Sequence, residues 1–178
     1  GLGADQIDRP VRFGPRFKNP GKSPLCKAKA AKGEAMLGAA ELGKLLDSAG
    51  TQLRAMILLG INCGFGNADC GQLTFRALDL KAGWVNFARG NTGISRRCPL
   101  WPETIEALTA AIAARPKPKD PANEPLVFIT KRKLSWFKDT PDNPVSWEFR
   151  KLLNETGLHD TSGKGFYWLR HTFETIGG

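Results

Sequence analysis

The chain has 178 residues, of which 41% are hydrophobic and 24% charged, and its formal net charge is +9. This length and composition fit one globular domain with an ordinary core plus a tail. They exclude a membrane-spanning segment, because no apolar run approaches the ~20 residues that a bilayer requires. We therefore expect a soluble, unexported protein.

The cysteine and histidine spacing does not indicate a metal site. The four cysteines have no CxxC pairing, and the two histidines do not complete a zinc finger. With no secretory leader and an ample apolar fraction, the chain has no need of disulfides, so we expect reduced, mostly buried thiols.

Residues 1–33 hold eight lysines and arginines and two aspartates, a net charge of +6, which is most of the chain's excess. Prolines and glycines interrupt the segment, so we interpret it as an extended basic arm or interdomain linker. Arg12, Arg16 and Lys18 alternate with phenylalanines, an arrangement suited to binding DNA phosphates. A solubilising linker without a binding role is an equal alternative.

Helical spacing of apolar residues begins after the arm. Residues 38–50 and 51–63 predict a helical hairpin, with Gly50 as the C-cap of the first helix and Thr51 as the N-cap of the second. The core positions expected in the second helix are Leu53, Met56, Ile57 and Ile61. Residues 67–75 then predict a short helix after a glycine-containing break.

Residues 84–100 predict a β-hairpin, because apolar side chains flank a turn-rich stretch at 91–93. A helix over 102–115 follows, with a proline in its first turn. Residues 126–130 predict a short buried strand that leads into a basic loop at 131–133.

Two more helices are expected, over 143–157 and 165–178. Their expected core positions are Val145, Phe149, Leu152, Leu153, Phe166, Leu169, Phe173 and Ile176. The order of elements predicts a mainly α (α+β) domain with a small antiparallel β-sheet or hairpin.

In the last helix, Tyr167, Arg170 and Glu174 share a face beside the apolar stripe. A guanidinium that is partly sheltered from water holds a phosphate bidentately and strongly. The alternative is an ion pair between Arg170 and Glu174 with no wider role.

Three segments together resemble a known family. YWLRHTFET, at 167–175, is similar to the second signature box of the tyrosine recombinases, or phage integrases. Residues 57–80 resemble the first box, and residues 83–104 resemble the hairpin that carries the family's catalytic lysine. The sequences GINCGFGNADC and RRCPLWPET also resemble those of a planctomycete-type integrase-like subgroup. The resemblance implies that residues 34–178 are a partial catalytic domain whose C-terminal part is missing.

Members of that family exchange DNA strands through a phosphotyrosyl intermediate, without a metal or nucleotide, and act as tetramers on paired sites. The resemblance thus implies a protein of DNA integration and recombination that needs no cofactor. It implies double-stranded DNA as the partner, a homo-oligomer on paired DNA sites, no membrane, and a cytoplasmic, nucleoid-associated location in a bacterium.

The family's catalytic groups are incompletely matched. The first-box arginine falls on Gly66, the hairpin lysine on Asn91 and the box-two histidine on Tyr167, whereas the box-two arginine is retained as Arg170. Tyr167 is the single tyrosine, and it does not stand at the family's nucleophile position, which lies past Gly178. The resemblance therefore implies a domain that binds DNA but is inactive as given.

The predicted DNA contacts are Arg89, Arg96, Arg97, Lys131, Arg132 and Lys133, together with the arm residues Arg12, Arg16 and Lys18. Arg76, Arg89, Arg96 and Arg97 are also possible substitutes for the missing cations. Two alternatives stay open. One is an active recombinase whose nucleophile lies beyond residue 178. The other is a non-catalytic helical interaction module that presents Trp101, Trp136 and Trp147 to a partner, although tryptophans are more often buried.

Overall fold

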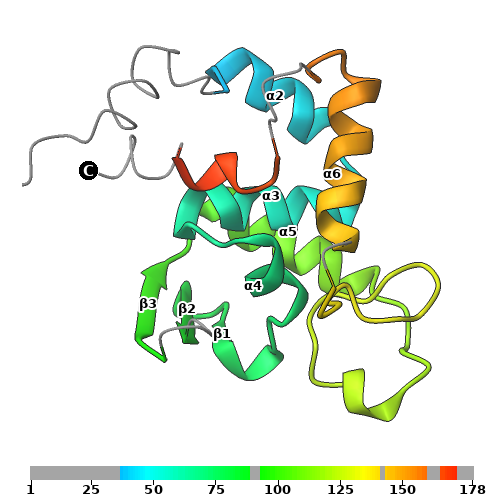
Figure 1. Ribbon diagram of the computed structural model, residues 1–178. Coiled ribbons are helices and arrows are strands. Elements are labelled where there is room, and N and C mark those ends of the chain that lie inside the picture. Colours follow the sequence, from blue (N-terminus) through cyan, green and yellow to red (C-terminus); the bar gives the residue numbers. More distant parts are fainter. Residues whose placement is uncertain (1–36, 89–92, 141–142, 160–164, 172–178) are drawn as a thin grey trace, which may run out of the picture. The chain divides into compact units, whose positions relative to one another are not determined.

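Four stretches of the chain are described by a computed structural model: residues 37–88, 93–140, 143–159 and 165–171. The chain divides into two units, Gly1–Ala35 and Met36–Gly178, and every described residue belongs to the second. This unit is mainly helical and contains one three-stranded sheet (Figure 1). None of the helices among the described residues is long and apolar enough to cross a membrane.

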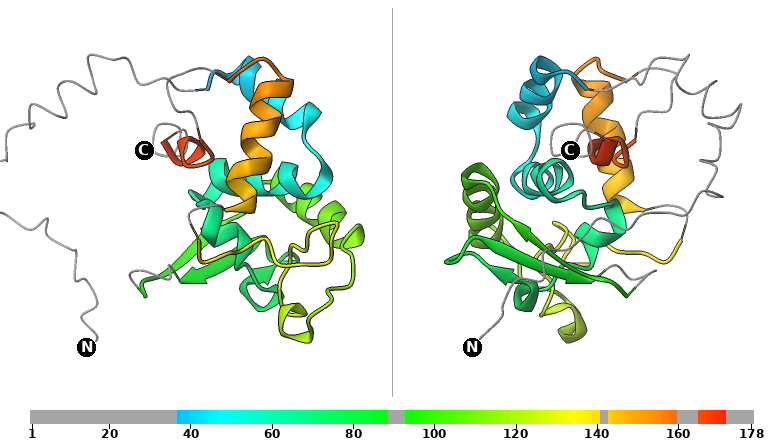
Figure 2. Two further views of the ribbon diagram at one scale, coloured as in Figure 1. Left: turned by 45° about the vertical axis from the view of Figure 1, so that its right-hand side comes forward. Right: turned by 90° about the vertical axis from the view of Figure 1, so that its left-hand side faces the viewer.

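Helix α3 (Thr51–Cys63) lies at the centre of this domain. Ten of its 13 residues are buried, which a helix can tolerate only when it is apolar on all sides. Helices α5 (Pro102–Ala113) and α6 (Pro144–Glu155) pack against it, and α2 (Ala39–Ser48) contacts α6 (Figure 2). The predicted core positions in α3 and α6 are confirmed: Leu53, Met56, Ile57, Ile61, Val145, Phe149, Leu152 and Leu153 are buried.

The helix ends around α3 differ from the prediction at one end. Gly50 has extended backbone, φ −62° and ψ 155°, and is the N-cap of α3, so Thr51 is the first helical residue. The predicted roles of Gly50 as a C-cap and Thr51 as an N-cap were wrong, because the chain passes from α2 into α3 without a left-handed residue. At the other end Gly64 does adopt φ 67°, and its N–H donates to the Gly60 carbonyl at 3.1 Å.

The sheet is antiparallel in the order β1 (Leu78–Asp79), β2 (Trp84–Ala88) and β3 (Ser95–Pro99). The pairing of β2 with β3 confirms the predicted hairpin. The residues that join these two strands, 89–92, lie outside the described residues.

The prediction of a strand over residues 126–130 was half right. Val127, Phe128 and Ile129 are buried, but only isolated bridges form, between Thr74 and Leu126 and between Ile129 and Ser135. Single hydrogen bonds to loops satisfy this backbone; for example, Val127 N–H donates to the Leu73 carbonyl at 2.8 Å. Burial here comes from apolar side chains under a loop, so an apolar run alone did not distinguish this arrangement from a sheet strand.

The last described segment, residues 165–171, packs onto the core. Phe166 and Leu169 are both buried, and the Phe166 ring meets Phe149 edge-on at a centroid distance of 5.4 Å. Residues 168–171 have helical backbone. The predicted core positions Phe173 and Ile176 lie outside the described residues.

Candidate nucleic-acid interface

Gly60 in α3 is the point at which the two signature segments meet. A Cβ placed on Gly60 would lie 3.0 Å from the Leu169 Cβ and 3.6 Å from the Phe65 carbonyl oxygen. The contact therefore brings Leu169 of the C-terminal segment onto the end of α3, beside the Phe65 carbonyl. A side chain at position 60 would therefore require Leu169 to move by a few tenths of an ångström.

We expect Gly60→Val to lower the free energy of unfolding by about 2 kcal/mol, because the added side chain would push Leu169 away from α3. Urea denaturation would measure the change. The matched control is Gly43→Ala in α2, where an added Cβ has nothing within 4 Å. That change should raise stability by roughly 0.5–1 kcal/mol through helix propensity. Stabilisation by both substitutions would contradict a tight contact at Gly60.

Gly66 begins the short helix α4 (Asn67–Gly71) as its N-cap, and its N–H donates to the Asp69 Oδ2 at 2.8 Å. Its backbone, φ −89° and ψ 175°, is open to any residue. A Cβ there would meet only the Asp69 Oδ2 within 4 Å, at 3.5 Å. The turn therefore does not require glycine, and the missing side chain is a feature of this sequence that the fold does not demand.

Arg170 is half-buried beside Leu169, which has 0% exposure. Its guanidinium carbon lies 5.7 Å from the centre of the Tyr167 ring, and that ring meets His171 edge-on at 5.5 Å. Tyr167 is 56% exposed, so its side chain is largely open to solvent. The alternative ion pair of Arg170 with Glu174 involves a residue outside the described ones.

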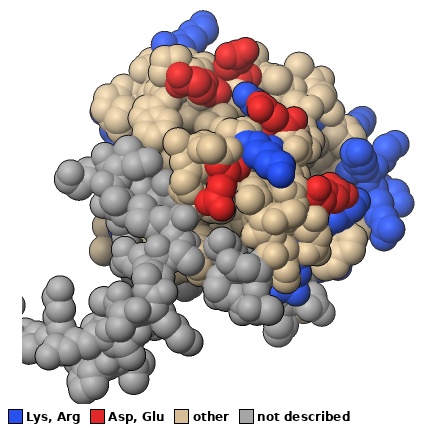
Figure 3. All heavy atoms as spheres, turned by 90° about the horizontal axis from the view of Figure 1, so that it is seen from above, with Lys and Arg blue, Asp and Glu red and all other residues tan. Residues whose placement is uncertain are grey.

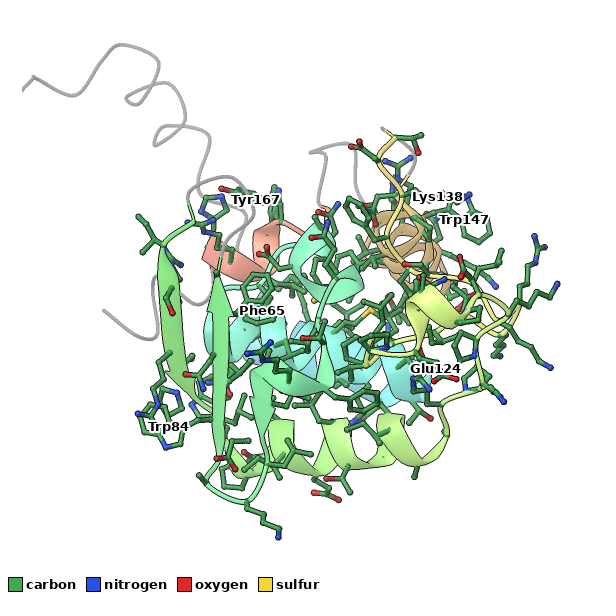
Figure 4. The ribbon with its side chains drawn as sticks, turned by 90° about the horizontal axis from the view of Figure 1, so that it is seen from below. Phe65, Trp84, Glu124, Lys138, Trp147 and Tyr167 are labelled. Carbon is green, nitrogen blue, oxygen red and sulfur yellow. The ribbon has the colours of Figure 1, made fainter. Side chains whose placement is uncertain are left out.

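The two arginines of β3 point to opposite faces of the sheet, because successive side chains alternate along a strand. Arg96 is opposite Phe87 in the register and shares the inner face with the buried Val85. Arg97 is on the outer face, where its guanidinium carbon lies 4.3 Å from the centre of the Trp84 ring. Figure 4 shows Trp84 on the side of the sheet that faces away from the helices.

A hollow of about 660 Å³ lies between the end of α3, the turn at Gly64 and the inner face of β2 and β3. The Phe65 and Phe87 rings meet in it, with centroids 4.8 Å apart (Figure 4). The lining residues are Ile61, Asn62, Cys63, Gly64, Phe65, Asp69, Val85, Phe87, Arg96, Arg97, Cys98, Pro99 and Trp101. The hollow therefore connects the Gly66 turn with the strand that carries Arg96.

Other predicted contacts are not brought to this place. Lys131, Arg132 and Lys133 are exposed in a turn that Figure 1 shows on the far side of the domain from β3. Asn91, Arg89, Arg12, Arg16 and Lys18 lie outside the described residues. On the face seen in Figure 3, acidic and basic side chains are interspersed. Lys151 and Glu155 form an exposed ion pair on α6, with 3.9 Å between the Nζ and the Oε1.

The three tryptophans proposed for the alternative interaction module differ in how much of each side chain is exposed. Trp147 is 63% exposed and Trp101 is 38% exposed. Trp136 is half-buried, and its Nε1–H donates to the Gln52 Oε1 at 2.9 Å. Trp136 is thus part of the loop packing, which leaves Trp101 and Trp147 as the exposed members.

Asn62 was not singled out from the sequence, although it organises this region. Its Oδ1 accepts from the Trp101 N–H at 2.8 Å and from the Thr104 hydroxyl at 3.0 Å, and its Nδ2 donates to the Pro99 carbonyl at 3.0 Å. One buried amide thereby ties α3 to the junction of β3 and α5. The signal in the sequence was a polar residue inside the apolar run at 57–63.

No family model matches the sequence, and no curated protein matches it. The structure is similar to XerA recombinase, with a TM-score of 0.65 and 20% identity over 79% of this chain and 49% of that chain. It is similar to a lambda integrase dimer bound to a COC′ core site, with a TM-score of 0.62 and 16% identity over 80% and 51%. The Tn1549 transposon integrase in complex with a circular intermediate DNA has a TM-score of 0.60 and 15% identity over 80% and 52%.

This chain spans about half the length of each of those structures. The likeness shows the fold, which is the mainly helical catalytic-domain fold of the tyrosine recombinases with its small antiparallel sheet.

Proposed function

We propose that this domain binds double-stranded DNA as an integrase-like or recombinase-like catalytic domain, and that the residues at the matched positions do not cut DNA by themselves. The observation that carries the proposal is the recombinase fold, in which the Gly66 turn and the Arg170 segment both lie against Gly60. A partly sheltered guanidinium such as that of Arg170 is suited to a phosphate.

The proposal of inactivity rests on what the described positions offer to a reacting phosphate. Gly66 has no side chain, and the exposed Tyr167 stands where the family has a histidine. A well-placed arginine contributes roughly 10³ to 10⁵ to the rate of phosphoryl transfer, so the loss at position 66 is severe. Arg96 is the better placed substitute on β3, because the guanidinium of Arg97 stacks on Trp84.

We expect duplex affinity to fall about 10²-fold to 10³-fold between 50 and 200 mM salt, as for a protein that neutralises roughly five phosphates. Fluorescence anisotropy titration of the full chain with a labelled duplex would measure it. An affinity that does not respond to salt would contradict DNA binding through phosphates. A stable complex with a protein partner that excludes DNA would instead favour the interaction module.

A nicked suicide substrate tests the activity question separately. We expect no covalent adduct between this chain and DNA on denaturing gels while binding persists. An adduct formed by a longer form of the protein would support the alternative of a nucleophile past residue 178.

The same DNA complexes, analysed by size exclusion, test the proposed homo-oligomer, since lambda integrase has been captured as a dimer on a core site and a tetramer on a Holliday junction. A cytoplasmic, nucleoid-associated location and membership of the planctomycete-type subgroup belong to the same proposal.

A further inference from the structure

Two cysteine thiols meet at the edge of the hollow. Cys63 is the last residue of α3, and Cys98 lies opposite Val85 in the register and therefore on the inner face of β3. Both residues line the hollow, and the Cys98 Sγ lies 3.5 Å from the carbonyl oxygen of Asn62, the residue before Cys63. Both are free cysteines in the structure.

The fold holds the backbones of these two cysteines close together. The Asn62 Nδ2, one residue before Cys63, donates to the Pro99 carbonyl, one residue after Cys98, at 3.0 Å. The Cys98 thiol also donates to the Asn62 carbonyl at 3.5 Å. Because these two hydrogen bonds join the segments that carry the pair, the fold keeps Cys63 and Cys98 next to each other.

The two thiols differ in reactivity. The hydrogen bond from Cys63 lowers the pKa of Cys98, which is half-buried and borders the hollow. The same hydrogen bond and burial raise the pKa of the Cys63 thiol. Since the thiolate is the nucleophile, Cys98 reacts first and Cys63 is the resolving partner. Cys70 is fully buried, which raises the pKa of its thiol, so it serves as an internal comparison.

We propose that Cys63 and Cys98 form a dithiol site that hydrogen peroxide oxidises to a disulfide joining α3 to β3. The Cys98 thiolate attacks one peroxide oxygen, the O–O bond breaks, and the leaving hydroxide takes a proton to become water. The Cys63 sulfur then displaces the hydroxyl of the Cys98 sulfenic acid, which leaves as a second water with the Cys63 proton. Two thiols are thereby oxidised, and one peroxide is reduced to two waters.

The bond would cross the wall of the hollow next to the Gly64 turn. It would fix the hairpin strand to the end of α3, and thioredoxin-type or small-thiol reductants would reverse it. This inference does not depend on DNA binding, so the oxidation experiment tests it independently of the proposed function.

The test is peptide mapping of the full chain after peroxide treatment, with Cys26→Ser as the background to remove a thiol outside the described residues. After quenching, denaturation and alkylation, we expect a Cys63 to Cys98 linked peptide about 2 Da lighter than the two thiol peptides together. Cys70 should be recovered alkylated. Dithiothreitol should restore both free peptides.

The control variant is Cys98→Ser, which changes a half-buried residue and leaves the buried Cys63 in place. We expect thiol loss at Cys63 to slow at least tenfold in this variant. Sulfinic or sulfonic acid on Cys98 with Cys63 still reduced would overturn the proposal. So would equal oxidation of Cys63 with and without Cys98, or a link to Cys70.

Discussion

Replacing Asn62 with leucine should lower the free energy of unfolding by about 3 kcal/mol, although the side chain is similar in size and more apolar. Asn62 is 4% exposed, and its amide holds the Pro99 carbonyl, the Trp101 N–H and the Thr104 hydroxyl. The three partner groups left unsatisfied cost roughly 1–3 kcal/mol each, and together they outweigh the gain of about 1.5–3 kcal/mol from burying leucine.

Urea denaturation followed by tryptophan fluorescence would measure the change at Asn62. The control is Asn154→Leu on the exposed side of α6, which should shift stability by less than about 0.5 kcal/mol. If Asn62→Leu were as mild as the control, the amide would not be what ties α3 to β3 and α5.

Substitutions at the two matched arginine positions should change DNA affinity in opposite directions. We expect Arg170→Ala to weaken duplex binding about tenfold, or about 1.4 kcal/mol, and to reduce the salt slope by about one. Gly66→Arg should strengthen binding by roughly fivefold to tenfold, because the turn accepts a side chain and the substitution adds a positive charge that can pair with a phosphate. Anisotropy titrations at one fixed salt concentration would compare the variants.

The matched control is Arg54→Ala at the start of α3, where the guanidinium donates to the Leu46 carbonyl at 2.8 Å and lies 3.9 Å from the Asp47 carboxylate. This substitution also removes one positive charge, but the Arg54 guanidinium already contacts Leu46 and Asp47. The affinity for duplex DNA should therefore change less than twofold. Equal losses for Arg54→Ala and Arg170→Ala would mean that net charge alone controls binding. A denaturation midpoint for Arg170→Ala keeps a folding defect separate from a lost contact.

Much of the fold could be predicted because its signals are local. Helical spacing predicted the core positions Leu53, Met56, Ile57 and Ile61 of α3, although not its burial on all sides, and Pro102 at the first helical position of α5 was predicted from its fixed φ. The hairpin was predicted from apolar residues that flank a turn. The strand predicted at 126–130 was only half right because the prediction also used a local signal. A short apolar run looks the same in the sequence whether it is buried under a loop or paired in a sheet.

The amino-acid sequence by itself determined which chemical groups three of the candidate positions carry: no side chain at Gly66, a phenol at Tyr167 and a guanidinium at Arg170. Only the tertiary structure decided which of them are neighbours. The packing of Leu169 over Gly60 and the placing of Cys98 beside the end of α3 both depend on contacts between distant segments. Spacing along the chain encodes the face of a helix or strand, whereas the close packing of a core determines what that face meets.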